Sequence, residues 1–300
     1  MKKLFLISSN AGATEYYFSK NHIEEIYKSY NKEDEIIVKE TKHAGHLEKI
    51  VKSFLKSDYD DKVIILLGGD GSLNELVNLC YGQDVTIGLI PTGTGNDFAK
   101  NFDYKNFTIE DTFNILKKPI DLIKINDKYC INVTSLGFDT EVLQKAYQYL
   151  KKDKSLGKRA YIKAVADRIF HLTYNNLKID LNLSDGSQIH FKDEFLISAI
   201  CNGSYYGSGF NPAPDAKIND GVINLVMAKR FPKYVLPSLI LKYKKGKHQN
   251  SKYLSELKVK SGLIRADKEF LGNIDGEIFK DKIIKFEVLP NAINWAYFDL

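Results

Sequence analysis

The sequence predicts an α/β protein of two domains, an N-terminal three-layer α/β domain followed by a C-terminal β-rich sandwich domain. Three observations support this prediction. Across residues 1–125, short apolar runs alternate with helical patterns, which is typical of a parallel sheet covered on both faces. From 126 to 290, runs of period two separated by turn signals indicate mostly antiparallel strands. The length of 300 residues suits about two domains, with 291–300 as a tail that closes the second domain or packs back on the first.

The elements of the first domain follow from the spacing of apolar residues. The run 63–67 is wholly apolar, so we expect a strand buried on both faces. In 43–55 the apolar residues recur at helical spacing, which predicts an amphipathic helix. The expected strands are 4–8, 35–38, 63–67 and 85–90, and the expected helices are 14–30, 43–55, 72–81, 96–102 and 109–117.

The second domain has a different pattern. A lysine-rich helical stretch covers 140–170, and a "SDGS" turn then separates two alternating runs, which predicts a hairpin. The expected strands are 129–138, 177–183, 188–193, 195–201, 221–228, 257–267 and 283–289, with a further helix within 231–248.

Composition narrows the classes of function. No apolar run approaches the roughly 20 residues of a membrane span. The apolar stretch 4–7 is too short for a signal peptide and no cleavage site follows it, so we expect a buried first strand. Cys80, Cys130 and Cys201 lack metal-site spacing and are expected to be buried thiols in a reducing cytosol. The net charge of +5 permits a nucleotide, a nucleic acid or a lipid surface as partner.

The stretch "VIILLGGDGSLNELVNLC" (63–80) contains the first candidate site. Gly68, Gly69 and Gly71 lie where an apolar strand meets a helix N-terminus. Such a corner presents bare backbone N–H groups and the positive end of a helix dipole, so an anion can approach it closely. Ligands in open α/β sheets bind at the carboxyl ends of strands. The alternative is a tight turn whose glycines need positive φ.

A second glycine corner follows the next strand, in "PTGTGNDFAK" (91–100). Two neighbouring strands therefore deliver two phosphate-type loops to one edge of the sheet, which argues against a coincidence. The pattern is neither the Walker lysine loop nor the G-x-G-x-x-G fingerprint. The acid and amide side chains that accompany the loops are Asp70, Asn74 and Glu75 in the first and Asn96 and Asp97 in the second.

With these two motifs the sequence resembles the diacylglycerol kinase catalytic-domain family of lipid kinases, which includes bacterial diacylglycerol kinases and sphingosine kinases. The motif "GGDGSLNELVN" is shared in outline with NAD kinases and phosphofructokinases, whereas "TGTGNDFA" is more specific to the lipid kinases. Ser72 stands where the family more commonly has threonine, and "SSNAG" lacks the family's usual proline. The resemblance extends to "NAG" (10–12), "TKHAGH" (41–46), "LGKRAYI" (156–162), "NPAPDAKINDG" (211–221), "KGKH" (245–248) and "NIDGE" (273–277), and thus spans nearly the whole chain.

The resemblance implies ATP as phosphoryl donor and a diacylglycerol-like hydroxyl as acceptor, giving phosphatidic acid or a related phospholipid. The nucleotide would contact the two glycine loops and the ends of the first two strands. The residues implied are Asn10, Thr41, Gly68, Gly69, Asp70, Gly71, Ser72 and Thr94, with Asn74, Glu75, Gly95 and Asn96 in the same loops. Thr41 can also be read as a helix cap, because a helix is expected to begin near His43.

Asp70 and Asp97 are expected to face each other across the two loops. Two carboxylates beside a triphosphate repel it unless a cation intervenes, and we expect that cation to be Mg²⁺. The alternative for Asp97 is a cap on the helix that begins near it. The resemblance adds Asp121 to the acidic network, and a turn residue is the alternative there.

The segment "IDGE" (274–277) is a hairpin turn by its spacing. The resemblance implies instead that this turn projects carboxylates toward the transferred phosphate, with Asp275 or Glu277 as general base. The residues leave that choice open. Because these acids belong to the second domain, catalysis is expected in an interdomain cleft.

The loop "PDAKINDGV" (214–222) is rich in oxygen ligands and suits either a cation or a solvated turn. The resemblance implies a structural Mg²⁺ held by the Asp220 side chain and by backbone oxygens of Lys217 and Val222.

Basic and apolar residues are mixed in 231–248, and 149–159 is a second basic stretch. This mixture suits a helix lying on an anionic membrane surface. The alternative is a surface helix whose apolar stripe is buried. Nucleic acid is not an expected partner, because the charge is dispersed and no recognition motif is present. An edge strand of either domain could pair to give a homodimer.

The sequence therefore predicts a cytoplasmic lipid kinase that associates reversibly with membranes. One rival is a nucleotide kinase similar to NAD kinase, which shares the first glycine motif. The other is a non-catalytic module that binds a nucleotide or a lipid.

Overall fold

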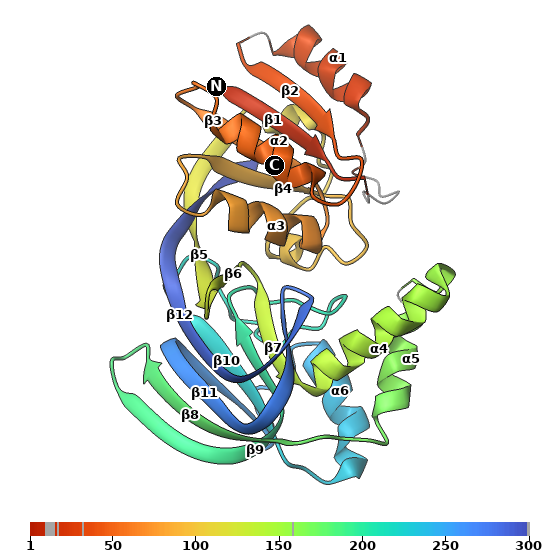
Figure 1. Ribbon diagram of the computed structural model, residues 1–300, viewed down its shortest axis with the longest axis vertical. Coiled ribbons are helices and arrows are strands. Elements are labelled where there is room, and N and C mark those ends of the chain that lie inside the picture. Colours follow the sequence, from red (N-terminus) through yellow and green to blue (C-terminus); the bar gives the residue numbers. More distant parts are fainter. Residues whose placement is uncertain (10–15, 17, 32, 158, 299–300) are drawn as a thin grey trace. The chain divides into compact units, whose positions relative to one another are not determined.

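The computed structural model describes residues 1–9, 16, 18–31, 33–157 and 159–298 (Figure 1). The chain divides into two compact units. Unit 1 comprises Met1–Ile120 and Asn291–Leu300, and unit 2 comprises Asp121–Pro290. The C-terminal segment therefore belongs to the same unit as the N-terminus.

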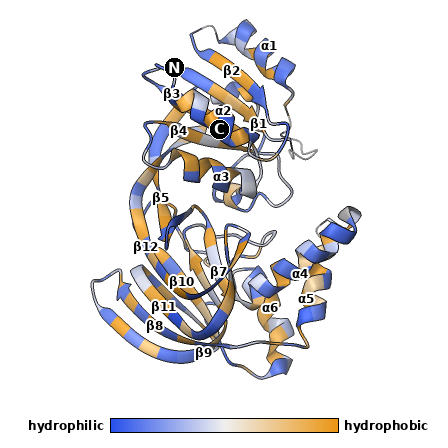
Figure 2. Cartoon of the chain, in the orientation of Figure 1, coloured by the Kyte–Doolittle hydropathy of each residue, from blue (hydrophilic) through white to orange (hydrophobic). Residues whose placement is uncertain are grey.

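Unit 1 is built on a parallel sheet. Its strands, in spatial order, are β2 (Glu35–Glu40), β1 (Lys2–Ile7), β3 (Lys62–Gly68), β4 (Thr86–Pro91) and the last part of β12 (Glu277–Phe298). Every residue of β1 and β4 is buried, which explains why the central strands have almost no polar alternation. In Figure 2 the larger part of these two strands carries the colour of hydrophobic residues, whereas the helices show both hydrophobic and hydrophilic residues.

Helices cover this sheet. They are α1 (Lys20–Tyr30), α2 (His46–Leu55) and α3 (Asp70–Cys80), with the short 3₁₀ turns η1 (Phe98–Asn101) and η2 (Ile109–Thr112). Phe5 of β1 meets Tyr27 of α1 edge to face, with ring centroids 5.3 Å apart. Lys3 of β1 is fully buried beside them and donates to the carbonyl of Thr112 at 2.8 Å. Helices α2 and α3 pack against each other.

The helix predicted over 109–117 is wrong beyond Thr112. A capping box between Thr108 and Asp111 closes a single 3₁₀ turn, and β5 (Ile115–Ile125) begins directly afterwards. Strand β5 pairs with β12 and with β6 (Lys128–Cys130). Pairing with distant strands therefore overrides the local helical pattern of 115–117.

Unit 2 is a two-layered antiparallel structure around one apolar core. Its remaining strands are β7 (Val133–Gly137), β8 (Asn175–Leu183), β9 (Gln188–Cys201), β10 (Ile223–Lys229) and β11 (Leu254–Ile274). The first part of β9 pairs with β8, and its second part pairs with β7 and β10, so one long strand contributes to both layers. The predicted break between 188–193 and 195–201 is wrong, because Asp193 and Glu194 stay paired with β8 despite interrupting the apolar pattern.

Three helices pack beside this sandwich through a second apolar cluster. They are α4 (Phe138–Lys152), α5 (Arg159–Arg168) and α6 (Leu236–Lys244). The short turn η3 (Lys154–Leu156) lies between α4 and α5, and η4 (Lys233–Val235) directly precedes α6. The predicted helical stretch 140–170 is thus two helices, and Asp153 leaves helical geometry between them. The cluster includes Phe138, Ala164 and Leu236. The predicted α/β fold with a β-sandwich second domain is confirmed.

Two predictions from composition can be compared with this fold. Cys80, Cys130 and Cys201 are free and buried, as expected. Within the described part of the chain, no helix combines the length and the apolar character needed to cross a membrane.

Candidate functional site

The two glycine loops meet at the carboxyl ends of β3 and β4. Gly68 ends β3 and Gly69 is the N-cap of α3, while β4 ends at Pro91. A Cβ on Gly93 would lie only 2.4 Å from the Cα of Gly69, so the two backbones touch. None of Gly68, Gly69, Gly71 and Gly95 has positive φ, so the tight-turn alternative is wrong. Glycine is needed here for close approach of backbone rather than for a left-handed conformation.

The structure brings Asp70 and Asp97 together, as predicted. The Asp70 carboxylate accepts the backbone N–H of Asp97 at 3.0 Å and that of Phe98 at 3.1 Å. Asp70 therefore caps η1 from the neighbouring loop. Asp97 occupies the N-cap position of η1, as the alternative reading expected, but its side chain makes no capping bond there.

The charge at this corner is only partly balanced. Burial raises the pKa of Asp70, and the neighbouring Asp97 raises it further, while the N–H groups of Asp97 and Phe98 oppose the change. Lys100 forms an ion pair with Asp97 and also donates to the carbonyl of Gly95 at 3.1 Å. One lysine thus faces two carboxylates. The sequence reading missed Lys100, although it lies three residues after Asp97, a spacing that can join the two side chains across a helical turn.

Hydroxyl groups gather at the same end of the sheet. Thr41 follows β2, and its Oγ1 accepts the N–H of Ser9 at 2.7 Å. Ser72 Oγ lies 3.1 Å from Ser8 Oγ, which follows β1. Helix α2 begins at His46 with Gly45 as its N-cap, so the interpretation of Thr41 as a helix cap is wrong. Asn10, predicted to join this group, lies outside the described residues.

The remaining predicted residues occupy distinct places in the two loops. Asn96 has φ of 51° and donates its side-chain amide to the carbonyl of Gly93 at 2.8 Å, which closes the second loop on itself. Thr94 is exposed. Gly95 lies against Asp70, because a Cβ added to Gly95 would be 3.0 Å from the Asp70 Oδ2 atom. Asn74 is buried within α3, and Glu75 is half-buried beside it.

Asp121 lies in β5 and is hydrogen-bonded to the 217–222 loop of unit 2. It is buried, its carboxylate accepts the N–H of Gly221 at 2.7 Å, and its own N–H donates to the carbonyl of Ile218 at 2.7 Å. Asp220 lies close enough that the Asp121 charge, after burial, raises the pKa of Asp220. The structure therefore joins Asp121 with the predicted Asp220 loop.

The "IDGE" segment is the tip of the hairpin between β11 and β12. Ile274 pairs with Glu277, which leaves the two-residue turn Asp275–Gly276, as the spacing predicted. The Asp275 carboxylate accepts the backbone N–H groups of Ile131, Asn132 and Val133, whereas Glu277 is exposed. Asn273, missed at the sequence level, is buried and bonds to Ser135 and Thr140. A polar residue at a buried position of a strand was the only signal for it.

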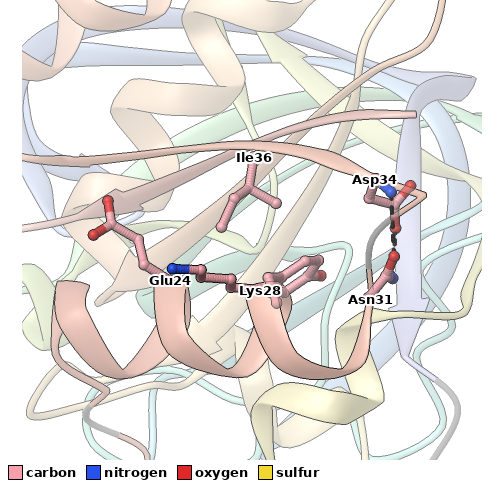
Figure 3. Close-up of a pocket in the computed structure, with 6 residues that line it drawn as sticks. Glu24, Lys28, Asn31, Asp34 and Ile36 are labelled. Carbon is pink, nitrogen blue, oxygen red and sulfur yellow. Dashed lines mark hydrogen bonds between the residues drawn. The ribbon is translucent and has the colours of Figure 1, made fainter.

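A cavity of unit 1 lies elsewhere, between α1 and β2 (Figure 3). It has a volume of about 390 Å³ and is lined by Glu24, Tyr27, Lys28, Asn31, Asp34 and Ile36. Asn31 donates to Asp34 at 2.9 Å, and Asp34 also pairs with the buried Lys3. None of the predicted site residues lines this cavity, and two of its polar residues, Asn31 and Asp34, link the end of α1 to Lys3 of β1.

Comparison with known proteins identifies the family. The family model of the diacylglycerol kinase catalytic domain matches residues 2–125, and that of the YegS C-terminal NAD kinase beta sandwich-like domain matches residues 132–297. A probable lipid kinase YegS-like of Shewanella frigidimarina (strain NCIMB 400) is 30% identical over 242 residues, which cover 78% of this chain and 75% of that protein. A second, from Serratia proteamaculans (strain 568), is 32% identical over 77% of this chain and 74% of that protein.

The fold is also that of a solved structure. The crystal structure of a diacylglycerol kinase from Bacillus anthracis str. Sterne superposes with a TM-score of 0.69 at 19% identity, covering 99% of this chain and 97% of that chain. Together with the two family models, these relatives show that the chain belongs to the lipid kinases built from a diacylglycerol kinase catalytic domain and a YegS-type C-terminal domain, and is a phosphotransferase that uses ATP as its donor.

Proposed function

We propose that the chain transfers the γ-phosphoryl group of ATP to the hydroxyl of a diacylglycerol-like lipid, producing phosphatidic acid or a related phospholipid. The observation that supports this most directly is the pair of glycine loops that touch at Gly69 and Gly93 beside Asp70 and Asp97. Backbone N–H groups at the start of α3 can receive phosphate oxygens where side chains are absent. The relatives named as lipid kinases support a lipid acceptor rather than NAD.

Phosphoryl transfer requires positioning and charge neutralisation more than covalent chemistry from the protein. The lipid oxygen forms a bond to the γ-phosphorus as the bond from that phosphorus to the β-bridging oxygen breaks and ADP leaves. The hydroxyl proton passes to a carboxylate. Asp275 and Glu277 are the acids proposed for that step.

The Asp70–Asp97 corner fits Mg²⁺ as the partner of the triphosphate. Protein sites commonly hold Mg²⁺ through one or two carboxylates, with phosphate oxygens and water completing the octahedron. Two adjacent carboxylates facing one lysine provide such a set, and burial, followed by the charge of Asp97, raises the pKa of Asp70. Among the described residues, no group of three or more His, Cys, Asp or Glu side chains is placed to hold a metal ion. When bound, the ion would neutralise charge on the β- and γ-phosphates.

A second, structural Mg²⁺ is proposed at the 217–222 loop. The carboxylates of Asp121 and Asp220 interact there, and Asp121 is almost wholly buried. Backbone oxygens of Lys217 and Val222 would complete the ligands. Its role would be to hold this loop against β5.

We further propose reversible association with an anionic membrane from the cytoplasm, through α5, α6 and the segments beside them. The apolar stripe of α6 is largely buried, since Leu236, Leu239 and Tyr243 face the interior. Large hydrophobic side chains nevertheless remain exposed in this region, namely Ile162, Phe170, Tyr234 and Leu241. Lysines adjoin them in sequence, including Lys163, Lys233 and Lys242. Exposed apolar groups combined with lysines favour adsorption to anionic lipid.

Labelled ATP offered with either diacylglycerol in mixed micelles or NAD tests the reaction. We expect phosphate in the lipid fraction only, no transfer in EDTA, and a loss of at least about 10²-fold in Asp70→Asn. Phosphorylated NAD without phosphorylated lipid would refute the proposal. Mass spectrometry of lipids that gain phosphate in a cell extract would identify the acceptor.

Sedimentation with vesicles tests the membrane surface. Tyr234→Ser combined with Leu241→Ser should weaken binding to anionic vesicles. Tyr30→Ser is the control, because the exposure of Tyr30, 74%, lies between those of Tyr234 and Leu241, 84% and 61%, and Tyr30 lies on α1 of unit 1. Equal binding by all three proteins would exclude this surface.

A further inference from the structure

Helix α4 begins directly at the end of β7, without a loop between them. Gly137 ends β7 and is also the N-cap of α4, with φ of 101°. A Cβ at this position would lie 2.3 Å from the carbonyl oxygen of Leu196, so the sharp change of direction requires glycine. Strand β7 pairs with the end of β11, and α4 packs against the same strand. The first turn of α4 therefore lies beside the part of β11 that leads into the hairpin turn.

One face of α4 is bonded to that turn. Thr140 and Tyr147 are seven residues apart, so they lie on the same face of the helix, about two turns from each other. Thr140 Oγ1 accepts the side-chain amide of Asn273 at 2.8 Å. Asn273 Oδ1 in turn accepts the N–H of Gly276 at 3.2 Å, and the Tyr147 hydroxyl donates to the carbonyl of Gly276 at 3.1 Å. Both backbone polar groups of Gly276 are thus held, one by Tyr147 directly and one through Asn273.

Asn273 connects three elements with one buried amide. Its side chain is only 4% exposed, and in the register of β7 and β11 it lies opposite Ser135. Its Nδ2 donates to Ser135 Oγ at 2.6 Å as well as to Thr140 Oγ1. Buried strand positions are normally apolar, and a buried amide is tolerated only when its bonds are made. The amide therefore joins β7, α4 and the turn, and its removal would leave buried partners unsatisfied.

The position of this turn matters for the proposed reaction. It carries Asp275, and Glu277 follows it directly. A carboxylate that accepts the hydroxyl proton must lie within hydrogen-bond reach of that hydroxyl, and a displacement of about 1 Å can lower the rate about 10²-fold. The Asp275 side chain is attached to the 131–133 backbone. The bonds to Gly276 restrain the other half of the turn.

We infer that Tyr147 and Asn273 are positioning residues for the phosphoryl transfer, through which α4 fixes the Gly276 peptide groups of the turn. This inference rests on the proposed function. Neither residue has to touch the substrate, because each acts through the backbone of the turn. Tyr147 does so from a side chain that is 42% exposed, so its hydroxyl can be removed without disturbing the core.

The test compares the full-length chain with Tyr147→Phe, and Tyr149→Phe is the matched control. Tyr149 lies on the same helix, but its hydroxyl donates to Asp167 of α5 at 2.8 Å. The control therefore removes the same atom from α4 without touching the turn. The measurements are lipid-dependent ATP turnover from pH 5 to 9, the KM for ATP, urea unfolding, and amide hydrogen exchange of residues 274–277.

Tyr147→Phe should lower kcat about 3- to 10-fold, the equivalent of one hydrogen bond, and should speed hydrogen exchange of the turn. The KM for ATP, the acid limb of the pH–rate profile and the urea midpoint should not change. Tyr149→Phe should leave both kcat and the exchange of the turn unchanged. Asn273→Ala should lower kcat about 10²-fold and also lower the urea midpoint, and Thr140→Val, which keeps the shape of the side chain, should fall between Tyr147→Phe and Asn273→Ala.

Full kcat in Tyr147→Phe together with faster exchange of the turn would show a merely structural bond and overturn the inference. Equal losses of kcat in Tyr147→Phe and Tyr149→Phe, or loss of the acid limb in Tyr147→Phe, would overturn it as well. If Asn273→Ala does not fold, Tyr147→Phe and Thr140→Val decide. In each of these cases the unaltered chain still phosphorylates a lipid alcohol. If it phosphorylated none, the proposed function would be overturned, and this inference with it.

Discussion

The pKa of Asp139 is set by a balance between burial and hydrogen bonding. Asp139 is the second residue of α4, and it accepts the hydroxyl of Tyr206 and the N–H of Thr140, each at 2.8 Å. Burial raises the pKa of Asp139 to about 6, against hydrogen bonds from Tyr206, Ser135 and Thr140 that lower it. The effect of burial on the pKa of Asp139 therefore outweighs the opposite effect of these hydrogen-bond donors.

This shift predicts a pH-dependent stability. The pKa in the folded chain, about 6, exceeds the ordinary value of 3.8, so between pH 4 and 6 the folded state keeps a proton that the unfolded state has lost. Stability should therefore fall as the pH rises through this window, by up to about 3 kcal/mol, and level off above it. The measurement is the free energy of urea unfolding from pH 4 to 8, taken as the difference between the unaltered chain and Asp139→Asn. A difference that does not change with pH would contradict the assignment.

At the scale of elements, the sequence predicted well where apolar runs were long and unbroken. Strands β1, β3 and β4 and helices α2 and α3 lie within a few residues of their expected limits. Strands β11 and β12 were predicted as shorter pieces, because charged residues near Asp267 and Asp281 interrupt the alternation. The pairing of β11 with β12 shifts register between Arg265 and Phe270 and then resumes. Such interruptions are tolerated where the side chain faces solvent, and the local pattern cannot reveal that.

The contacts of the candidate site show the same limit of what local sequence can predict. Adjacent parallel strands place the two glycine loops together, so the meeting of Asp70 and Asp97 followed from sequence order. The attachment of Asp275 to the amides of 131–133 joins residues more than 140 positions apart. The same holds for Asp121 and Gly221, which are 100 positions apart. These contacts depend on strand order within unit 2, which spacing alone does not fix.

Alanine substitutions at two glycines of these loops, Gly93 and Gly71, should have opposite effects on stability. Gly93→Ala places a Cβ 2.4 Å from the Cα of Gly69, so it should cost about 3 kcal/mol of stability. Gly71→Ala meets nothing within 4 Å and lies inside α3, so it should stabilise the chain by about 0.5–1 kcal/mol. If phosphate approaches this backbone, Gly71→Ala should also weaken ATP binding about tenfold, or 1.4 kcal/mol.

Urea unfolding and nucleotide titration of both variants measure these effects. The informative result is the combination in Gly71→Ala of higher stability with lower ATP affinity. Unchanged affinity in that variant would show that Gly71 is retained for a reason other than nucleotide access.

For the whole molecule, the main structural consequence is that unit 1 is assembled from both ends of the chain. The segment after Pro290 supplies a parallel neighbour to β4, with Asn294 opposite Thr86 and Trp295 opposite Ile87. The sequence analysis left open whether this segment closes the second domain or packs back on the first. Parallel pairing next to β4 needs the chain to return from unit 2, a long-range connection that costs loop-closure entropy and must be offset by packing.

That packing is concentrated in Trp295, which predicts a large effect of its removal. Trp295 is almost wholly buried, stacks on Phe102 with centroids 5.4 Å apart and meets Phe98 edge to face at 5.2 Å. Trp295→Ala should cost about 3–5 kcal/mol, whereas Trp295→Phe keeps one ring in the cluster and should cost about half as much or less. Calorimetric unfolding of the three proteins measures the difference. Because η1 carries Phe98 and is capped by Asp70, loosening this cluster should also weaken ATP binding in Trp295→Ala. A loss below 1 kcal/mol in Trp295→Ala would mean that β4 is held without the returning strand, and unit 1 should then remain folded in a chain that ends at Pro290.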